Sequence, residues 1–237
     1  KSKSAMFPVF SLRGGIGCTS IAVNLALLLQ QVGATALLDL STNSGHCALY
    51  LGMKSSRHWG ILLEEADLNN ATTIGGLTLK HASGLRLLAS PPYPMTDGGF
   101  DPEQVELLIN VFRQYMRFIV VDMPPTLTST AHKVLEDARR IVLVSGNDSP
   151  GIQTTLQTLK VLDKYREKTS LLINNPTPGR RPPMDALQRA LRISISTQIP
   201  YDAKQSQARN SASPSVLSQP KSPMVTHLQK LTRQLLT

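Results

Sequence analysis

The sequence predicts an α/β protein with three layers, in which helices cover both faces of a mostly parallel central sheet. Short runs rich in Val, Ile and Leu alternate with helix-length segments along the whole chain. The runs lack polar alternation, which is typical of parallel strands buried on both faces. Repeated strand–helix alternation favours right-handed crossovers. Because 41% of the 237 residues are hydrophobic, the chain can fill one core, and we expect residues 1–237 to form a single domain.

The individual elements follow from these patterns. Apolar runs predict strands at residues 6–11, 35–40, 85–89, 118–122, 141–145, 170–174 and 193–199. Helical patterns include residues 19–32, 102–115, 129–136, 150–164, 183–191 and 222–236. Stretches rich in Pro, Gly or Ser predict loops at residues 90–101, 175–183 and 209–223. A domain boundary near residues 176–183 is the alternative to a loop there.

A glycine-rich segment follows the first predicted strand. Residues 11–20 read Ser-Leu-Arg-Gly-Gly-Ile-Gly-Cys-Thr-Ser, and a long apolar-periodic segment begins directly after them. A strand, a glycine-rich turn and a helix start, in that order, form a phosphate cradle, because glycine lets backbone N–H groups approach a phosphate. Thr19 would lie in the first helical turn, where a hydroxyl can bind Mg²⁺. A turn that merely joins a strand to a helix is the alternative.

Two positions depart from the usual P-loop pattern. Cys18 takes the place of the lysine that reaches the β- and γ-phosphates, and Leu12 takes the place of the first glycine. Arg13 is a candidate to restore a positive charge from a different position. A cysteine at a helix N-terminus predicts a lowered thiol pKa, so a redox role for Cys18 is the alternative to a small loop residue.

Two further predicted strands end in a carboxylate. Asp39 ends the run Thr-Ala-Leu-Leu-Asp, and Asp122 ends the run Phe-Ile-Val-Val-Asp. Ligands of open parallel sheets bind at the carboxyl ends of the strands, where an aspartate near a phosphate loop can hold Mg²⁺ or its waters. A cap or turn role is the alternative for either residue. The glycine loop and two aspartates at equivalent strand ends together favour a nucleotide site.

The charge of the chain is strongly basic, with 25 Lys and Arg against 16 Asp and Glu, or +9. Such a charge suits nucleic acid, anionic lipid or an acidic partner, and equally a solvated basic surface. The candidates for a DNA-binding face that contacts phosphates are Arg180, Arg181, Arg189, Arg192, Lys204 and Arg209. The basic amphipathic segment 222–236 fits a membrane surface or the core, and core packing is favoured.

Cysteine and histidine usage points to no metal site. Cys18 and Cys47 have neither metal-ligand spacing nor a disulfide framework, which suits a reducing cytoplasm, and the five histidines are scattered. No apolar run reaches about 18 residues and no signal-peptide pattern opens the chain, so we expect a soluble, cytoplasmic protein. Because the chain begins at Lys1 and not at Met, we expect a fragment of a longer protein.

Taken together, these segments resemble the ParA/MinD family of P-loop ATPases, whose Walker A motif is a deviant one. The family loop reads Lys-Gly-Gly-x-Gly-Lys-Thr-[Thr/Ser], and residues 13–20 here are Arg-Gly-Gly-Ile-Gly-Cys-Thr-Ser. The other similar segments, in chain order, are residues 21–26 (first helix), 37–41 (Asp-x-Asp), 120–125 (Walker B), 172–174 (a strand ending in Asn) and 199–202 (Ile-Pro-x-Asp). The resemblance spans nearly the whole chain and implies the P-loop NTPase fold, with ATP and Mg²⁺ as ligands.

The resemblance also implies roles for individual residues. The implied nucleotide-binding residues are Arg13, Gly14, Gly15, Ile16, Gly17, Cys18, Thr19, Ser20, Asn174 and Pro200. The implied Mg²⁺ ligands are Thr19, Asp39 and Asp122, of which the two aspartates are also the weak catalytic candidates. Ser41 stands where the family has the second aspartate of Asp-x-Asp, which positions the attacking water. Because Cys18 and Ser41 replace groups that act on the γ-phosphate, we expect weak nucleotide binding and slow or absent hydrolysis.

A degenerate loop without the P-loop lysine resembles one branch, the TadZ/CpaE proteins of Flp/Tad pilus assembly. That branch implies a spatial organiser or localisation factor with pilus or polar machinery proteins as partners, recruited to a pole or to the inner membrane face. It also implies a receiver-like domain before this one, and the ParA/MinD family as a whole implies a nucleotide-linked homodimer in which Arg13 would reach the partner's phosphates. Arg13 departs from the lysine usually kept there. The alternatives are an active partition-type ATPase that binds DNA non-specifically and a scaffold that binds no nucleotide.

Overall fold

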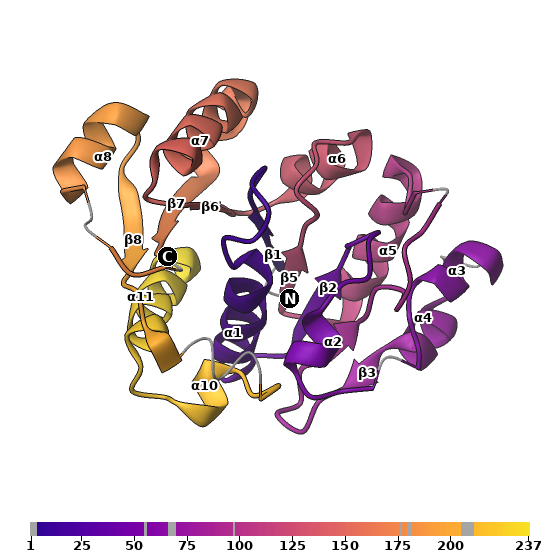
Figure 1. The fold of residues 1–237 in the computed structure, drawn as a ribbon. Helices are drawn as coiled ribbons and strands as arrows, with labels where there is room; N and C mark the ends of the chain where they lie inside the picture. Colours follow the sequence, from indigo (N-terminus) through magenta and orange to yellow (C-terminus); the bar gives the residue numbers. More distant parts are fainter. Residues whose placement is uncertain are drawn as a thin grey trace.

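A mostly parallel sheet forms the centre of the protein in the computed structural model, which describes residues 4–54, 56–65, 70–96, 98–175, 177–179, 182–204 and 211–237. Within these residues the sheet has eight strands in the order β3-β4-β2-β5-β1-β6-β7-β8 (Figure 1). The strands are β1 Ala5–Phe10, β2 Thr35–Asp39, β3 Leu79–Lys80, β4 Arg86–Leu88, β5 Phe118–Asp122, β6 Ile141–Ser145, β7 Thr169–Asn174 and β8 Ile195–Ile199. Only β3, which pairs with β4, runs antiparallel among the described strands.

Helices cover both faces of this sheet, as the three-layer prediction requires. They are α1 Cys18–Gln30, α2 Cys47–Tyr50, α3 Gly60–Glu65, α4 Ala71–Leu77, α5 Pro102–Tyr115, α6 Ser129–Asp137, α7 Ser149–Val161, α8 Met184–Leu191, α10 Ser215–Ser218 and α11 Pro223–Leu236, with a 3₁₀ helix, η1, at Asp163–Lys168. Alternate side chains of β1 enter two cores: Phe7 packs with α1 and α11, and Met6 packs with α5 and α6 on the opposite face. The predicted fold class is therefore confirmed.

The structure corrects several predicted boundaries. The strand β3 and the short helices α2, α3, α4 and α10 were not predicted, and α10 lies inside the loop expected at residues 209–223. The helix expected at 150–164 ends at Val161 and continues as η1, and the strand expected at 193–199 begins at Ile195. The missed elements are too short for periodicity to reveal them, since they are formed by tertiary contacts more than by local pattern.

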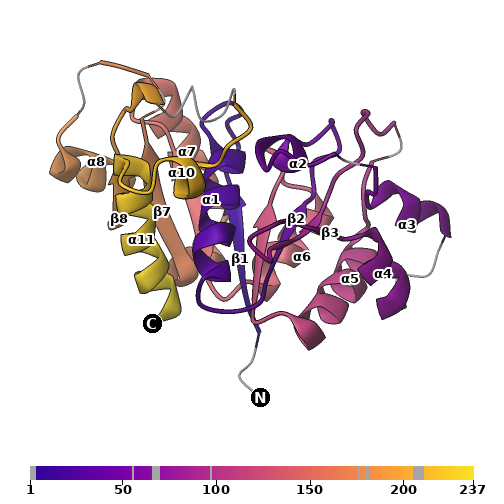
Figure 2. The same ribbon diagram turned by 90° about the horizontal axis from the view of Figure 1, so that it is seen from below.

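The C-terminal helix α11 belongs to the core, as predicted. Its apolar face is buried against α1 and β8, and Figure 2 shows α11 lying beside α1. Ser222 caps the helix by accepting a hydrogen bond from the Val225 N–H, and Pro223 occupies the first turn, where its missing N–H is not needed. No helix in the described ranges is both long and apolar enough to cross a lipid bilayer.

Truncating the buried face of α11 is expected to destabilise the whole domain. Leu228 is fully buried, so Leu228→Ala should lower the free energy of unfolding by about 2–5 kcal/mol, through lost burial and the cavity left behind. Leu236 lies on the same helix and is 37% exposed, so Leu236→Ala should change the free energy of unfolding by less than about 0.5 kcal/mol. Urea unfolding measures both, and equal losses would contradict the core assignment.

Candidate functional site

A cavity of about 800 Å³ lies at the carboxyl ends of the central strands. The glycine loop after β1 lines one side, from Ser11 to Ser20, and residues 122–125 after β5 line another. The segment after β2, which includes Ser41 and α2, lines the remaining part. This is the edge where open parallel sheets bind ligands, and the volume is that of an ordinary small-molecule site.

The glycine loop leaves the first amides of α1 without a capping side chain. Gly17 occupies the N-cap position with φ 96°, and no side chain hydrogen-bonds to the helix N-terminus. A Cβ at Gly17 would lie only 2.8 Å from the Asn174 side-chain nitrogen, so this position requires glycine for space as well as for its left-handed backbone. Uncapped amides at a helix N-terminus, facing a cavity, are an anion site.

Asn174 stabilises the glycine loop through a hydrogen bond to its backbone. The residue ends β7 and is buried, and its Nδ2 donates a hydrogen bond of 2.6 Å to the carbonyl oxygen of Ile16. Among the described atoms its Oδ1 is buried without a hydrogen-bond partner. Neither Asn174 nor Pro200 lines the 800 Å³ cavity. The contact with adenine that the sequence suggests for these two residues stays a prediction.

The two aspartates predicted at strand ends lie side by side. Asp39 of β2 and Asp122 of β5 are paired in the parallel register, and both are buried. Both carboxylate oxygens of Asp39 accept backbone hydrogen bonds, from the Ser41 N–H at 3.1 Å and the Cys47 N–H at 3.2 Å. Asp122 lines the cavity, whereas Asp39 does not. The sequence therefore predicted the pair correctly, and the structure assigns its members different surroundings.

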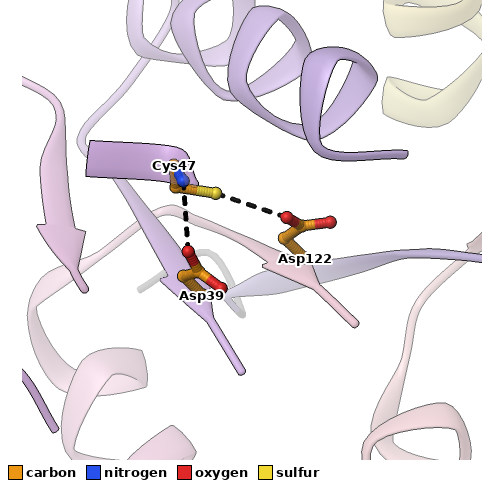
Figure 3. Close-up of side chains that lie close together, drawn as sticks. All are labelled: Asp39, Cys47 and Asp122. Atoms are coloured by element: carbon orange, nitrogen blue, oxygen red, sulfur yellow. Dashed lines mark hydrogen bonds between the residues drawn. The ribbon is translucent and has the colours of Figure 1, made fainter. Parts of the chain in front are cut away.

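Cys47 is the site residue that the sequence did not reveal. Its Sγ donates a hydrogen bond to Asp122 Oδ2 at 3.4 Å, and its backbone N–H donates one to Asp39 (Figure 3). One ligand atom from each of Asp39, Cys47 and Asp122 lies within 4.8 Å of the other two. Spacing could not show this cluster, because its members come from two strands and from a helix too short to predict.

Burial shifts the protonation of both carboxyl groups. Desolvation, followed by the charge of Asp39, raises the pKa of Asp122 to about 7, although hydrogen bonds from Thr19 and Cys47 oppose the shift. Desolvation also raises the pKa of Asp39, against the hydrogen bonds from Ser41 and Cys47. Two buried like charges this close cannot both ionise freely without a cation.

The lowered thiol pKa predicted for Cys18 is not found. Burial, with the nearby charge of Asp122, raises the pKa of the Cys18 thiol, although the helix N-terminus was predicted to lower it. A backbone hydrogen bond at Cys18 acts in the other direction and is the smaller effect. The predicted lowering is therefore wrong, and with it the thiolate on which the redox alternative depended.

Arg13, which lines the cavity, forms an ion pair with a carboxylate. Its Nη1 pairs with Asp148, the residue that precedes α7, and this pairing raises the pKa of Arg13 and lowers that of Asp148. Gly146 and Gly151 leave room for the guanidinium, because a Cβ at either would lie within 3.2 Å of Arg13 Nη1. In this structure the charge predicted to serve phosphate contacts is compensated by Asp148.

The structure describes only some of the basic residues predicted to form a DNA-binding face. Arg180, Arg181 and Arg209 lie outside the described residues. Arg189 is paired with Asp185 one turn earlier in α8, at 2.9 Å. The described part of the chain therefore leaves the basic face a prediction.

The site has the chemistry of a phosphate and cation site. Oxygen ligands suit Mg²⁺, and Asp122 and Thr19 offer a carboxylate and a hydroxyl at the cavity wall. Asp39 would act behind Asp122 through water or charge. The residues present therefore fit Mg²⁺ together with a phosphate on the glycine loop.

Replacing Gly17 is expected to strain the loop. Gly17→Ala places a Cβ on a left-handed residue and against Asn174, so the free energy of unfolding should fall by about 1–3 kcal/mol. Gly14 has open space around its Cα and no positive φ, so Gly14→Ala should be tolerated. Thermal unfolding compares the two variants, and equal melting temperatures would contradict the constraint at Gly17.

The raised pKa of Asp122 predicts a stability that depends on pH. A carboxyl whose pKa rises on folding, from 3.8 to about 7, stabilises the native state while protonated. The free energy of unfolding should therefore fall as the pH rises from about 4 through 7. Urea unfolding at pH 5 and pH 8 with a chelator present measures this. Asp122→Asn should reduce the fall, and an unchanged fall would refute the assignment.

Comparison with known proteins identifies the fold. No family model matches the chain. An uncharacterized ATP-binding protein of Methanocaldococcus jannaschii is 23% identical over 177 residues, which cover 70% of this chain and 63% of that protein. A ParA family ATPase from Chlorobium tepidum superposes with a TM-score of 0.85 at 21% sequence identity. The match covers 100% of this chain and 99% of that one. MinD from Pyrococcus horikoshii, solved with Mg-ADP, superposes with a TM-score of 0.81 at 19% sequence identity. The match covers 98% of this chain and 96% of that one. The chain therefore has the fold of ParA- and MinD-type P-loop ATPases.

Proposed function

We propose that this chain is a nucleotide-binding protein of the ParA/MinD type that binds ATP with Mg²⁺ and hydrolyses it slowly or not at all. The observation that carries the proposal is the glycine loop with its uncapped helix amides, which lines a cavity of about 800 Å³ together with Asp122. The M. jannaschii relative is described as ATP-binding, and the P. horikoshii structure holds Mg-ADP. Both descriptions support ATP and Mg²⁺ as the ligands here.

The phosphates would be held mainly by backbone. Amides of residues 14–19 supply hydrogen bonds that do not depend on the side chain at position 18. Thr19 and Asp122 would hold Mg²⁺, which bridges phosphate oxygens and offsets their charge. For Asn174 and Pro200, a contact with the base remains part of the proposal.

Hydrolysis needs charge stabilisation and a positioned water, and the site is poor in both. Cys18 supplies no charge where the P-loop lysine would stand, and Arg13 is paired with Asp148. Ser41 lines the cavity where the family has a second carboxylate, and Asp39, whose two oxygens each accept one backbone hydrogen bond, does not line it. Removing one electrostatic contact to a transition state costs about 10²–10³ in rate.

The biological role we propose is that of a TadZ/CpaE-like localisation factor in pilus assembly, with pilus or polar machinery proteins and a second copy of the chain as partners. It rests on the loop sequence at residues 13–20, which lacks the lysine. The net charge of +9 favours a second candidate, a partition-type ATPase that binds DNA non-specifically. A salt-sensitive shift of plasmid DNA by the domain would favour the second candidate.

The test of the nucleotide site is calorimetry of ATP·Mg²⁺ binding with phosphate release followed on the same sample. We expect binding without rapid turnover. Cys18→Lys should tighten binding about tenfold, because an ammonium group would form a charge-assisted contact with the phosphates.

Cys18→Met is the matched control, since its side chain is long and uncharged, and it should not tighten binding. Rapid turnover by the natural sequence would overturn the proposed loss of hydrolysis and favour the partition-type ATPase. Failure of the natural sequence and of Cys18→Lys to bind ATP would overturn the nucleotide function and leave a scaffold with this fold.

A further inference from the structure

The two cysteines of the chain converge on one aspartate. Cys47 hydrogen-bonds Asp122, and Cys18 lies near enough for the Asp122 charge to act on its thiol. Cys18 and Asp122 also line the same cavity. The chain has only 2 cysteines in 237 residues, so all its thiols lie around this carboxylate. Neither the phosphate cradle nor Mg²⁺ binding has a use for Cys47.

The geometry of the cluster is close to that of a metal centre. Metal–sulfur bonds of about 2.3 Å and metal–oxygen bonds of about 2.1 Å place neighbouring tetrahedral ligands roughly 3.5 Å apart. Cys47 Sγ and Asp122 Oδ2 already lie 3.4 Å apart, and the Asp39 ligand atom lies within 4.8 Å of both. The three atoms can therefore meet one ion with a small movement of side chains.

The two buried carboxyl groups of the cluster would be stabilised in their ionised form by a cation. Asp39 and Asp122 are buried side by side, and neither forms an ion pair with a basic side chain in the described part of the protein. His46 is the basic residue whose charge acts on Asp39, and it is exposed at the cavity wall. Ionising both carboxylates without a counter-ion is costly, and a buried divalent ion would remove that cost.

The donor set decides which ion. Mg²⁺ prefers oxygen ligands, whereas a thiol that loses its proton favours zinc-class ions. We propose that Asp39, Cys47 and Asp122 bind one thiophilic divalent cation of the Zn²⁺ class, with a water molecule in the fourth coordination position, on the side of the cavity that Asp122 lines. Binding forms a metal–sulfur bond and releases the Cys47 thiol proton to solvent.

This site does not depend on the proposed nucleotide function, although it shares Asp122 with it. A Zn²⁺-class ion on Asp122 occupies the carboxylate that Mg²⁺ would use. The two cations are therefore mutually exclusive, and the soft ion would hold α2 against the ends of β2 and β5.

The test uses Co²⁺ and Zn²⁺ with purified, reduced, nucleotide-free protein. Co²⁺ should produce a thiolate-to-metal charge-transfer band that saturates at one ion per chain, and Zn²⁺ should abolish it while a thousandfold excess of Mg²⁺ should not. Cys47→Ser should weaken Zn²⁺ binding about 100-fold or more, as measured by competition with a chromophoric chelator. Cys18→Ser, the matched control, should retain the band.

Two further readouts keep the test decisive. Zn²⁺ at a hundredfold excess over its Kd should raise the Tm of the natural protein by about 5 °C, and that of Cys47→Ser by no more than about 1 °C. Trp59, the single tryptophan, donates to the backbone oxygen of Asp39 at 2.7 Å, so its fluorescence should report metal binding in the natural chain even if a variant fails to fold.

Three results would overturn the proposal: no charge-transfer band, a band that Cys18→Ser removes and Cys47→Ser retains, or displacement of the ion by Mg²⁺ at equal concentration. Any of these would leave Cys47 as a hydrogen-bond donor to Asp122 alone. Because all measurements are made without nucleotide, this failure is distinct from failure to bind ATP.

Discussion

The burial of two adjacent carboxyl groups, Asp39 and Asp122, is the constraint on which the site depends. Parallel pairing of β2 with β5 puts the two residues in register at the carboxyl edge of the sheet, and both side chains are buried there. Hydrogen bonds stabilise the two carboxyl groups: the Ser41 and Cys47 amides donate to Asp39, and the Cys47 thiol donates to Asp122. Gly45 is required beside them, because a Cβ there would overlap the carboxylate of Asp39.

The phosphate loop depends on the same edge but is stabilised differently. It follows β1, the strand between β5 and β6, and β7 supplies the Asn174 amide that holds its Ile16 carbonyl. The groups that we propose to bind phosphate are backbone amides, whose positions are set by Gly17 and the start of α1. A backbone cradle keeps its shape when a side chain such as the P-loop lysine is lost, whereas the charge that lysine carried is not replaced.

The consequence is a site with unbalanced charge. Arg13, the basic group of the loop, is compensated by Asp148, and neither buried carboxyl group forms an ion pair with a basic side chain in the described residues. Protonation, Mg²⁺ brought with a nucleotide, or a soft cation on Cys47 would each lower the free-energy cost of the buried charge at Asp122. Occupancy by one of these excludes the others, so the cation at Asp122 would decide how the site responds to nucleotide.

The sequence by itself determined the fold class, most strands, the glycine loop and the two strand-end aspartates, because each is encoded within a few neighbouring residues as an apolar run, a glycine pattern or a terminal carboxylate. Only the tertiary structure decided that Cys47 meets Asp122, 75 residues away, and that Arg13 pairs with Asp148, 135 residues away. It also decided that the Cys18 pKa rises, since desolvation depends on what surrounds the thiol and not on its place at a helix start. Short elements such as α2 escaped prediction for the same reason: packing, and not local periodicity, makes them fold.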